Sequence, residues 1–307
     1  MNKESSKRRK SGHLFSTAAE DLKNARQEVK EAEEGPSAAQ VNSPAYRLAF
    51  DDLDFLVREE LRPVRLLLEL TKPELTLQEH KVLNTVVIFG SARTPSPEMV
   101  DAEQAQLDLQ IKIAPRNPAL LKIQKTLHFK RMQSRYYAEA RRLAEIITER
   151  SKSEEGAKAL VITGGGPGVM EAANRGAVDA GGESIGLNIV LPHEQYPNTY
   201  ITPKFCFQFH YFAIRKMHFL LRARALVVFP GGFGTFDELF ETLTLVQTGK
   251  IAAMPILVFG REFWEKVIDW NFMVEQGVIS AEDLHLFKYV ENAEEAWEYI
   301  KDSLHIE

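Results

Sequence analysis

The stretch ALVITGGGPGVMEAANRGA, residues 159–177, joins a short apolar run to a glycine-rich turn and then to a helical pattern. A β-branched run of this length that ends in glycine is typical of a buried parallel strand. The turn at 164–168 places backbone N–H groups at the positive end of the following helix, where a phosphate can bind. It matches neither the dinucleotide motif G-x-G-x-x-G nor a Walker loop. A tight turn that merely requires positive φ is the alternative interpretation.

Similar apolar runs recur along residues 84–307. They lie at 85–90, 184–190, 225–229 and 255–259, with an aromatic run at 204–209. Helical patterns separate most of them, at 131–150, 168–180, 210–223, 235–248 and 261–276. This alternation predicts a doubly wound, Rossmann-like α/β fold, a parallel sheet with helices on both faces. Residues 94–130, which contain four prolines, interrupt the pattern as a partly helical insertion near the mouth of any site.

The first 83 residues have a different character. Residues 1–42 are charged and poor in large apolar side chains, which predicts a solvated tail that is disordered or partly helical around 17–34. Residues 43–83 predict a helical extension, because leucine and valine recur there at spacings of three and four. Pro63 should kink or divide it. We expect this extension to pack on the main body or on another subunit.

Composition excludes several classes of protein. The chain has 307 residues, 44% of them hydrophobic and 26% charged, the usual mix for a globular protein. The net charge of −5 differs from the strongly basic balance of a nucleic-acid binder. One cysteine excludes an internal disulfide framework and a multi-cysteine zinc site. The chain has neither a bilayer-length apolar run nor a secretory signal, so we expect a cytoplasmic protein without a membrane partner.

A second glycine-rich turn occurs in PGGFGTFDE, residues 230–238, again between a strand and a helix. Its three glycines allow the backbone to approach a ligand, and Thr235 could cap the helix. Glu238 is then expected on the first helical turn, facing the crevice at the carboxyl end of the sheet. Two such turns in one sheet predict a site for an anionic small molecule.

The segment FAIRKMHF, residues 212–219, holds the adjacent cations Arg215 and Lys216 near the start of an otherwise apolar helix. In one interpretation both side chains are solvated. In the other they place a cation in the crevice, where it holds a phosphate or stabilises a developing negative charge. His210 and His218 are eight residues apart, a poor spacing for two metal ligands on one helix.

These three segments together resemble the Lonely Guy family, whose members were often mislabelled as lysine decarboxylases. Its hallmark P-G-G-x-G-T-x-x-E is matched at all six fixed positions of 230–238, and the Arg-Lys pair precedes Glu238 at the family's distance. The resemblance covers residue 84 to about 302. The N-terminal extension and the 94–130 insertion fall outside the compact family core, as in a longer, bacterial-type member.

The resemblance implies hydrolysis of the N-glycosidic bond of a nucleoside 5′-monophosphate, giving free base and ribose 5-phosphate. The substrate would be AMP, a related purine or pyrimidine nucleotide, or a cytokinin riboside monophosphate. Arg215 and Glu238 would be the catalytic pair, with Lys216 beside Arg215. The 5′-phosphate would be held by Gly231, Gly232, Gly234 and Thr235, with Thr244 next to it. The other implied substrate-binding residues are Gly90, Ser91, Gly164, Gly165, Gly166, Gly168, Met170, Glu171 and Glu194.

The residue types suit that chemistry. Cleaving a ribosyl C–N bond develops positive charge on the sugar, much as in glycoside hydrolysis. Glu238 could stabilise that charge, orient the ribose hydroxyls or take a proton from the attacking water. No metal, nicotinamide or pyridoxal cofactor is required. A non-catalytic nucleotide or phosphate-cofactor carrier is the alternative, and a scaffold built on the tail is a third; retention of both Arg215 and Glu238 favours the enzyme.

The helices at 210–223 and 235–248 carry apolar residues on more than one face. A helix that covers one side of a sheet needs a single apolar stripe. Apolar surface beyond that stripe must be buried elsewhere, which predicts a homodimer or a higher homo-oligomer with the crevice near the interface. The family resemblance also favours such an assembly. Coverage of these faces by the helical extension within one chain is the alternative.

Overall fold

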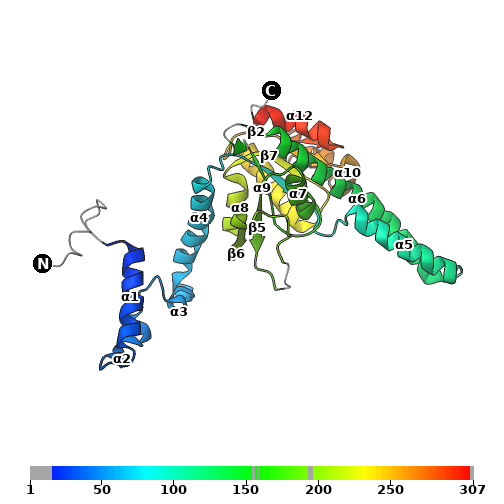
Figure 1. Cartoon of the computed structure of the whole chain (residues 1–307). Helices are drawn as coiled ribbons and strands as arrows, with labels where there is room; N and C mark the ends of the chain where they lie inside the picture. Colours follow the sequence, from blue (N-terminus) through cyan, green and yellow to red (C-terminus); the bar gives the residue numbers. More distant parts are fainter. Residues whose placement is uncertain (1–15, 154–155, 158, 193–195, 305–307) are drawn as a thin grey trace. The chain divides into compact units, whose positions relative to one another are not determined.

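The computed structural model describes residues 16–153, 156–157, 159–192 and 196–304, which belong to two compact units, residues 1–68 and 69–307 (Figure 1). The first unit contains α1 (Ala18–Ala32), α2 (Ala38–Val41), α3 (Leu53–Leu56) and 3-10 turns at Pro44–Tyr46 and Glu59–Leu61. Thr17 starts α1 with a capping box, because its hydroxyl accepts from Glu20 N–H while the Glu20 carboxylate accepts from Thr17 N–H. The helix expected around 17–34 is therefore present.

Helix α4 (Arg62–Glu79) continues from the first unit into the second. Pro63 lies in its first turn, where a missing N–H breaks no helical hydrogen bond. The expected helical extension is therefore divided just before Pro63, into α3, a 3-10 turn and α4, and the proline begins the last of these helices without kinking it. Near the end of α4, Leu77 is buried in the core of the second unit.

The second unit is built on a seven-stranded parallel sheet with the order β6-β5-β4-β1-β7-β8-β9. The strands are β1 (Thr85–Phe89), β4 (Leu160–Thr163), β5 (Ser184–Ile189), β6 (Cys206–Phe209), β7 (Ala223–Val228), β8 (Ile256–Phe259) and β9 (Lys288–Val290). A separate antiparallel pair joins β2 (Lys152–Ser153) to β3 (Gly156–Ala157). β1 lies at the centre, and the chain adds strands first on its β4 side and then on its β7 side.

Helices cover both faces of this sheet, so the predicted doubly wound fold is confirmed (Figure 1). They are α6 (Pro118–Arg150), α7 (Val169–Asp179) and α12 (Ala293–Ser303) on one face, and α8 (Phe212–Leu220), α9 (Phe233–Gln247), α10 (Arg261–Val267) and α11 (Trp270–Glu275) on the other. The side chains of β1 alternate between the two cores: Val86 and Ile88 face α6 and α7, and Val87 and Phe89 face α8 and α9.

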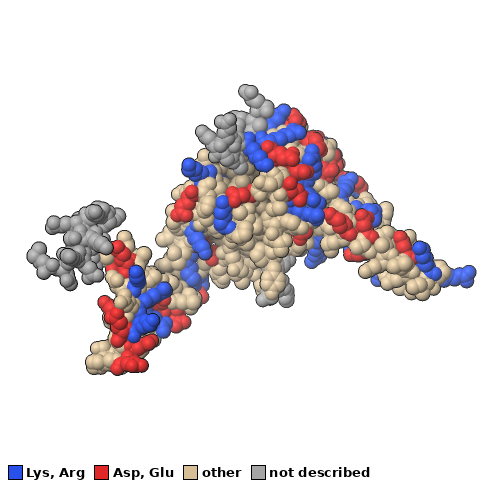
Figure 2. Space-filling model, viewed as in Figure 1, with Lys and Arg blue, Asp and Glu red and all other residues tan. Residues whose placement is uncertain are grey.

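The insertion forms a helical hairpin from α5 (Pro97–Ile113) and the first half of α6 (Figure 1). Its own small core consists of Val100, Leu107, Leu120 and Leu127. Helix α6 is 33 residues long and includes the helix predicted at 131–150, because neither glycine nor proline occurs between 119 and 150. Figure 2 shows acidic and basic side chains interspersed along this hairpin and over the visible face of the second unit.

The C-terminal part departs from the sequence prediction in two places. The helix expected at 261–276 is divided into α10 and α11, because Asp269 leaves the helical conformation and caps α11 through Phe272 N–H at 2.9 Å. The strand β9 and helix α12 follow, and a further 3-10 turn spans Glu282–His285. Trp297 and Ile300 of α12 are buried against the sheet.

Candidate active site

Three turns meet at the carboxyl end of the sheet, where β1 lies between β4 and β7. They are residues 90–91, 164–168 and 230–232. Ser91 N–H donates to Pro230 O at 3.1 Å, and Val169 N–H donates to Ser91 O at 3.1 Å. The strand order reverses at β1, because earlier strands are added on its β4 side and later strands on its β7 side. This edge is therefore the topological switch point at which doubly wound sheets bind ligands. Gly90 and Ser91 therefore stand between the two glycine-rich turns.

The first glycine-rich turn is tightly packed. Gly168 has φ of 71° and precedes α7, and a Cβ added there would collide with the Ser91 carbonyl oxygen. A Cβ on Gly164 would lie 2.7 Å from Arg215 Nη2 and 2.8 Å from Met170 Sδ. The turn therefore runs directly beside Arg215, with Met170 against its first glycine. Gly165 and Gly166 complete it.

The second glycine-rich turn differs from its prediction in one detail. Helix α9 begins at Phe233 with Gly232 as its N-cap, two residues before the predicted start. The expected capping role of Thr235 is therefore wrong; its side chain is buried and packs against Gly231, where an added Cβ would overlap the Thr235 hydroxyl. Glu238 lies on the second helical turn, and a Cβ on Gly232 or Gly234 would meet only open space. Room for a ligand thus remains at the start of α9.

Arg215 reaches from α8 to strand β5 and to the turn that follows β4. Its Nε donates to Leu187 O at 2.7 Å and its Nη2 to Gly164 O at 3.4 Å, while its guanidinium lies 5.2 Å from the centre of the Phe219 ring. Burial lowers the pKa of Arg215, and the nearby Glu238 carboxylate opposes that shift. A half-buried arginine retains its charge, so a fixed cation lies beside the first glycine-rich turn.

Glu238 is buried, with only 8% of its surface exposed. Burial raises its pKa from the usual 4.5 to about 7, although Arg215 and Lys216 both oppose the rise. Within the described part of the chain, its carboxylate accepts no hydrogen bond. The turn of α9 that follows the open loop therefore holds a carboxyl group that changes charge near neutral pH.

Lys216 and Thr244 are turned to other partners. Lys216 Nζ lies 3.0 Å from both Asp237 and Glu241, so its charge is neutralised by α9. The Thr244 hydroxyl donates to Phe240 O at 2.7 Å on an exposed face of α9. That face forms an open groove of about 450 Å³, lined by Phe233, Phe236, Asp237, Phe240, Glu241, Thr244 and Leu245. The structure does not bring Thr244 to the Glu238 carboxyl group.

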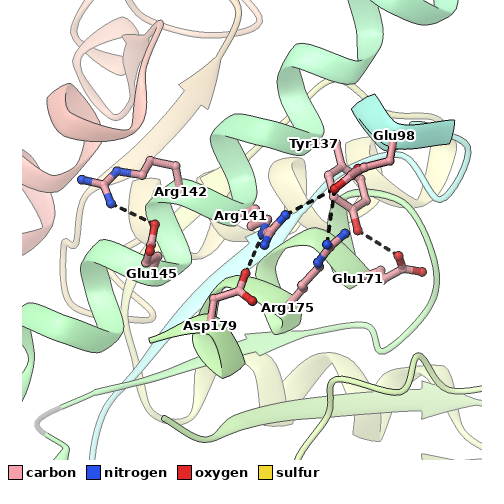
Figure 3. Close-up of polar contacts among 8 residues, drawn as sticks. All are labelled: Glu98, Tyr137, Arg141, Arg142, Glu145, Glu171, Arg175 and Asp179. Carbon is pink, nitrogen blue, oxygen red and sulfur yellow. Dashed lines mark hydrogen bonds and ion pairs between the residues drawn. The ribbon is translucent and has the colours of Figure 1, made fainter. Parts of the chain in front are cut away.

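Glu171 lies in the first turn of α7 and points toward α6 (Figure 3). It accepts a hydrogen bond from the Tyr137 hydroxyl at 2.8 Å. Burial raises the pKa of Tyr137, so the phenol stays protonated and donates. Arg175 and Arg141 lie 3.3 and 3.5 Å from Glu98 at the start of α5 (Figure 3). These contacts tie the insertion to the helix that carries the first glycine-rich turn.

Sequence reasoning missed three polar residues around this turn. Tyr137 donates to Glu171 from the buried face of α6, and Asn174 and Asn198 form a hydrogen-bond network behind the loop. The signal available in the sequence was Asn174, a polar residue that follows two alanines at a core position of its helix. Glu194, named from the resemblance, lies outside the described residues.

No group of three His, Cys, Asp or Glu side chains among the described residues is arranged to hold a metal ion. No helix in the described ranges has the length and apolar character needed to cross a bilayer.

Known proteins resemble this chain over part of its length. Residues 170–300 match the family described as "Possible lysine decarboxylase". A probable cytokinin riboside 5′-monophosphate phosphoribohydrolase of rice, Oryza sativa subsp. japonica, is 29% identical over 140 residues, 44% of this chain and 59% of the rice protein. The cytokinin riboside 5′-monophosphate phosphoribohydrolase of Arabidopsis thaliana is 27% identical over 147 residues, 47% of this chain and 67% of that protein.

Among solved structures, the Moco carrier protein of Chlamydomonas reinhardtii is 19% identical, with a TM-score of 0.39 over 72% of this chain and 98% of that chain. A structural-genomics target is 18% identical, with a TM-score of 0.40 over 71% of this chain and 99% of that chain. Likeness at this level says nothing about a shared ligand. The matching family and the plant relatives confirm the resemblance that the glycine-rich turns and the Arg-Lys pair had indicated.

Proposed function

With its resemblance to the Lonely Guy family confirmed, we propose that this protein hydrolyses the N-glycosidic bond of a nucleoside 5′-monophosphate. The observation that carries the proposal is Glu238, a buried carboxyl group with a pKa of about 7 beside the fixed cation Arg215. Both lie at the switch point where two glycine-rich turns face one crevice. The products are a free base and ribose 5-phosphate.

Binding begins with the phosphate. The open space at Gly232 and Gly234 lies at the start of α9, where free backbone N–H groups and the helix dipole favour an anion. Arg215 adds a positive charge where it is held by Gly164 O and Leu187 O. Binding energy from the phosphate then positions the reacting bond, which is remote from it.

Cleavage transfers a water oxygen to C1′ of the ribose. The C1′–N bond breaks, its electron pair stays with the base, and the positive charge that builds on the sugar is stabilised by a nearby carboxylate. In its ionised form Glu238 supplies that negative charge and takes the proton that water releases. The same proton is then returned to the base as it leaves, which regenerates the carboxylate. A pKa near the working pH suits a group that accepts and then returns a proton.

The name of the matching family suggests a different reaction, and Lys216 argues against it. A lysine that forms a Schiff base must lose its proton easily. Burial alone would lower the pKa of Lys216, but its hydrogen bonds to Asp237 and Glu241 outweigh burial and raise it. Lys216 is therefore held in its charged form, paired with carboxylates of α9.

The proposal is tested by incubating the purified protein with AMP, GMP, CMP and UMP and separating the products by chromatography. Release of free base and ribose 5-phosphate in equal amounts from at least one nucleotide is expected. Release of nucleoside would indicate a phosphatase, and binding without any product would indicate a carrier; either result would contradict the proposed reaction.

A further inference from the structure

The segment after β5 is hydrogen-bonded to the back of the first glycine-rich turn. Asn198 N–H donates to Gly165 O at 2.9 Å, and the Asn198 side-chain Nδ2 donates to Gly166 O at 3.1 Å. Two successive carbonyl groups of the turn are thus held by one residue, which is 30 or more positions away in sequence. The Asn198 side-chain oxygen accepts from Tyr200 N–H at 3.2 Å, which fixes the orientation of the amide.

Asn198 is itself held by a buried network. Its Nδ2 also donates to Asn174 Oδ1 at 2.9 Å, and Asn174 is fully buried on α7. Thr163 Oγ1 donates to the same Asn174 oxygen at 2.8 Å and accepts from Gly165 N–H at 3.0 Å. Asn174 Nδ2 donates to Ser184 Oγ at 2.9 Å. Strand β4, strand β5 and helix α7 therefore all fix the position of Asn198.

These bonds determine where one backbone donor points. In a trans peptide the C=O and the N–H point in opposite directions. Since the Gly165 carbonyl points toward Asn198, the Gly166 N–H of the same peptide points away from it. Gly166 is buried, and among the described residues its N–H has no acceptor. A buried N–H without a partner is costly unless a ligand accepts from it.

The neighbouring residues place this donor at the ligand crevice. The next residue is Pro167, which has no N–H, and the preceding Gly165 N–H is already used by Thr163. Gly164, two positions earlier, borders the Arg215 guanidinium. The Gly166 N–H is therefore a donor of this turn left for an anionic ligand.

We propose that Asn198 is a positioning residue, which holds the Gly165–Gly166 peptide so that the Gly166 N–H donates to an anionic group of the nucleotide. This role rests on the proposed nucleotide substrate but concerns its binding, not its cleavage. The side-chain bonds to Gly166 O and Asn174 Oδ1 keep residue 198 in place, and with it the backbone N–H that holds Gly165 O. Losing them would loosen the Gly165–Gly166 peptide and weaken one charge-assisted hydrogen bond to the ligand.

The test compares Asn198→Asp with wild type. Asp has the same shape and still accepts from Tyr200 N–H, but it cannot donate to Gly166 O or to Asn174. We expect KM for AMP to rise at least about 10-fold, the lower range for a hydrogen bond to a charged group, with a smaller change in kcat. Calorimetric titration with ribose 5-phosphate should show the same loss of affinity. Thr202→Ala is the matched control, because Thr202 anchors the same segment to Ser184 N–H at 3.0 Å and does not touch the turn.

A second measurement needs only the wild-type protein and stands even where the variant does not fold. In ¹⁵N-glycine-labelled protein, the Gly166 amide resonance should move downfield when AMP or ribose 5-phosphate is added. An unmoved Gly166 resonance with both ligands, or a folded Asn198→Asp protein with wild-type affinity and KM, would overturn the proposal. Wild-type protein that binds AMP without cleaving it would refute the proposed hydrolysis alone, because the shift and the affinity loss would remain measurable.

Discussion

Replacing Glu238 with glutamine removes a charge while keeping the shape of the side chain. Burial raises the Glu238 pKa from 4.5 to about 7, which means that the folded protein favours the protonated carboxyl group. Ionising it therefore costs the folded state at most about 3 kcal/mol. The cost is absent below pH 4.5, grows between pH 4.5 and about 7, and is constant above that. Glutamine is neutral throughout, so the variant should match wild type in stability near pH 4.5 and exceed it at pH 8.

Activity should change in the opposite direction. Without the carboxylate, turnover of AMP at pH 8 should fall at least ~10²-fold, the scale of a positioned acid or base, while KM changes little. Chromatography of released adenine gives kcat and KM, and thermal unfolding at the two pH values gives the stability. Glu241→Gln is the matched control, since Glu241 lies one turn further along α9 and pairs with Lys216. Wild-type turnover in Glu238→Gln, or a loss of stability at both pH values, would refute the assignment.

Four further expectations concern the same site and α9. In steady-state assays, kcat/KM of the wild type should rise with pH through about 7 as Glu238 ionises; a profile that falls there would assign Glu238 as the acid. Arg215→Ala should raise KM, lower kcat and move that profile to higher pH, because Arg215 lowers the Glu238 pKa; unchanged kinetics would place Arg215 outside the site. In thermal unfolding, Gly231→Ala should destabilise the protein by roughly 1–3 kcal/mol and Gly234→Ala by much less. Only the Cβ added at Gly231 meets other atoms, so equal effects of the two substitutions would contradict the loop geometry. We also propose a homodimer through the groove on α9, where Phe233 is 97% exposed. Sedimentation of the wild type should give about twice the 34.8 kDa chain mass, and Phe233→Asp should give monomers. A monomeric wild type would contradict the proposed dimer.

The sequence predicted the repeating units of this fold well, for a local reason. A buried parallel strand, a glycine-rich turn and a helix follow one another within about 20 residues, so the pattern at 159–177 is complete in itself. The edge strand β9 has only three residues, Lys288–Val290, too few to show a period. Helix α6 was predicted only in part, because the prolines of the insertion suggested a boundary, although Pro118 begins the helix.

Contacts between side chains on different helices, strands and turns could not be predicted from the local sequence pattern. The Arg215-Lys216 pair stood out in the sequence, but the structure separates its members: Arg215 reaches Leu187 and Gly164, and Lys216 is paired with carboxylates of α9. Adjacent positions on a helix point in directions about 100° apart, so they meet different neighbours. Asn198 was missed for a similar reason, since its partners come from α7 and from the turn that precedes that helix.

The central claim is that this crevice cleaves a nucleotide between ribose and base. It is tested most directly by a time course with AMP in which adenine, adenosine and ribose 5-phosphate are all quantified, for wild type and Glu238→Gln side by side. We predict that wild type releases adenine and ribose 5-phosphate in equal amounts over many turnovers, with no adenosine, and that the variant binds AMP but releases at most about a hundredth as much. Intact AMP recovered from wild-type protein that binds it, or equal rates for the two proteins, would contradict the claim.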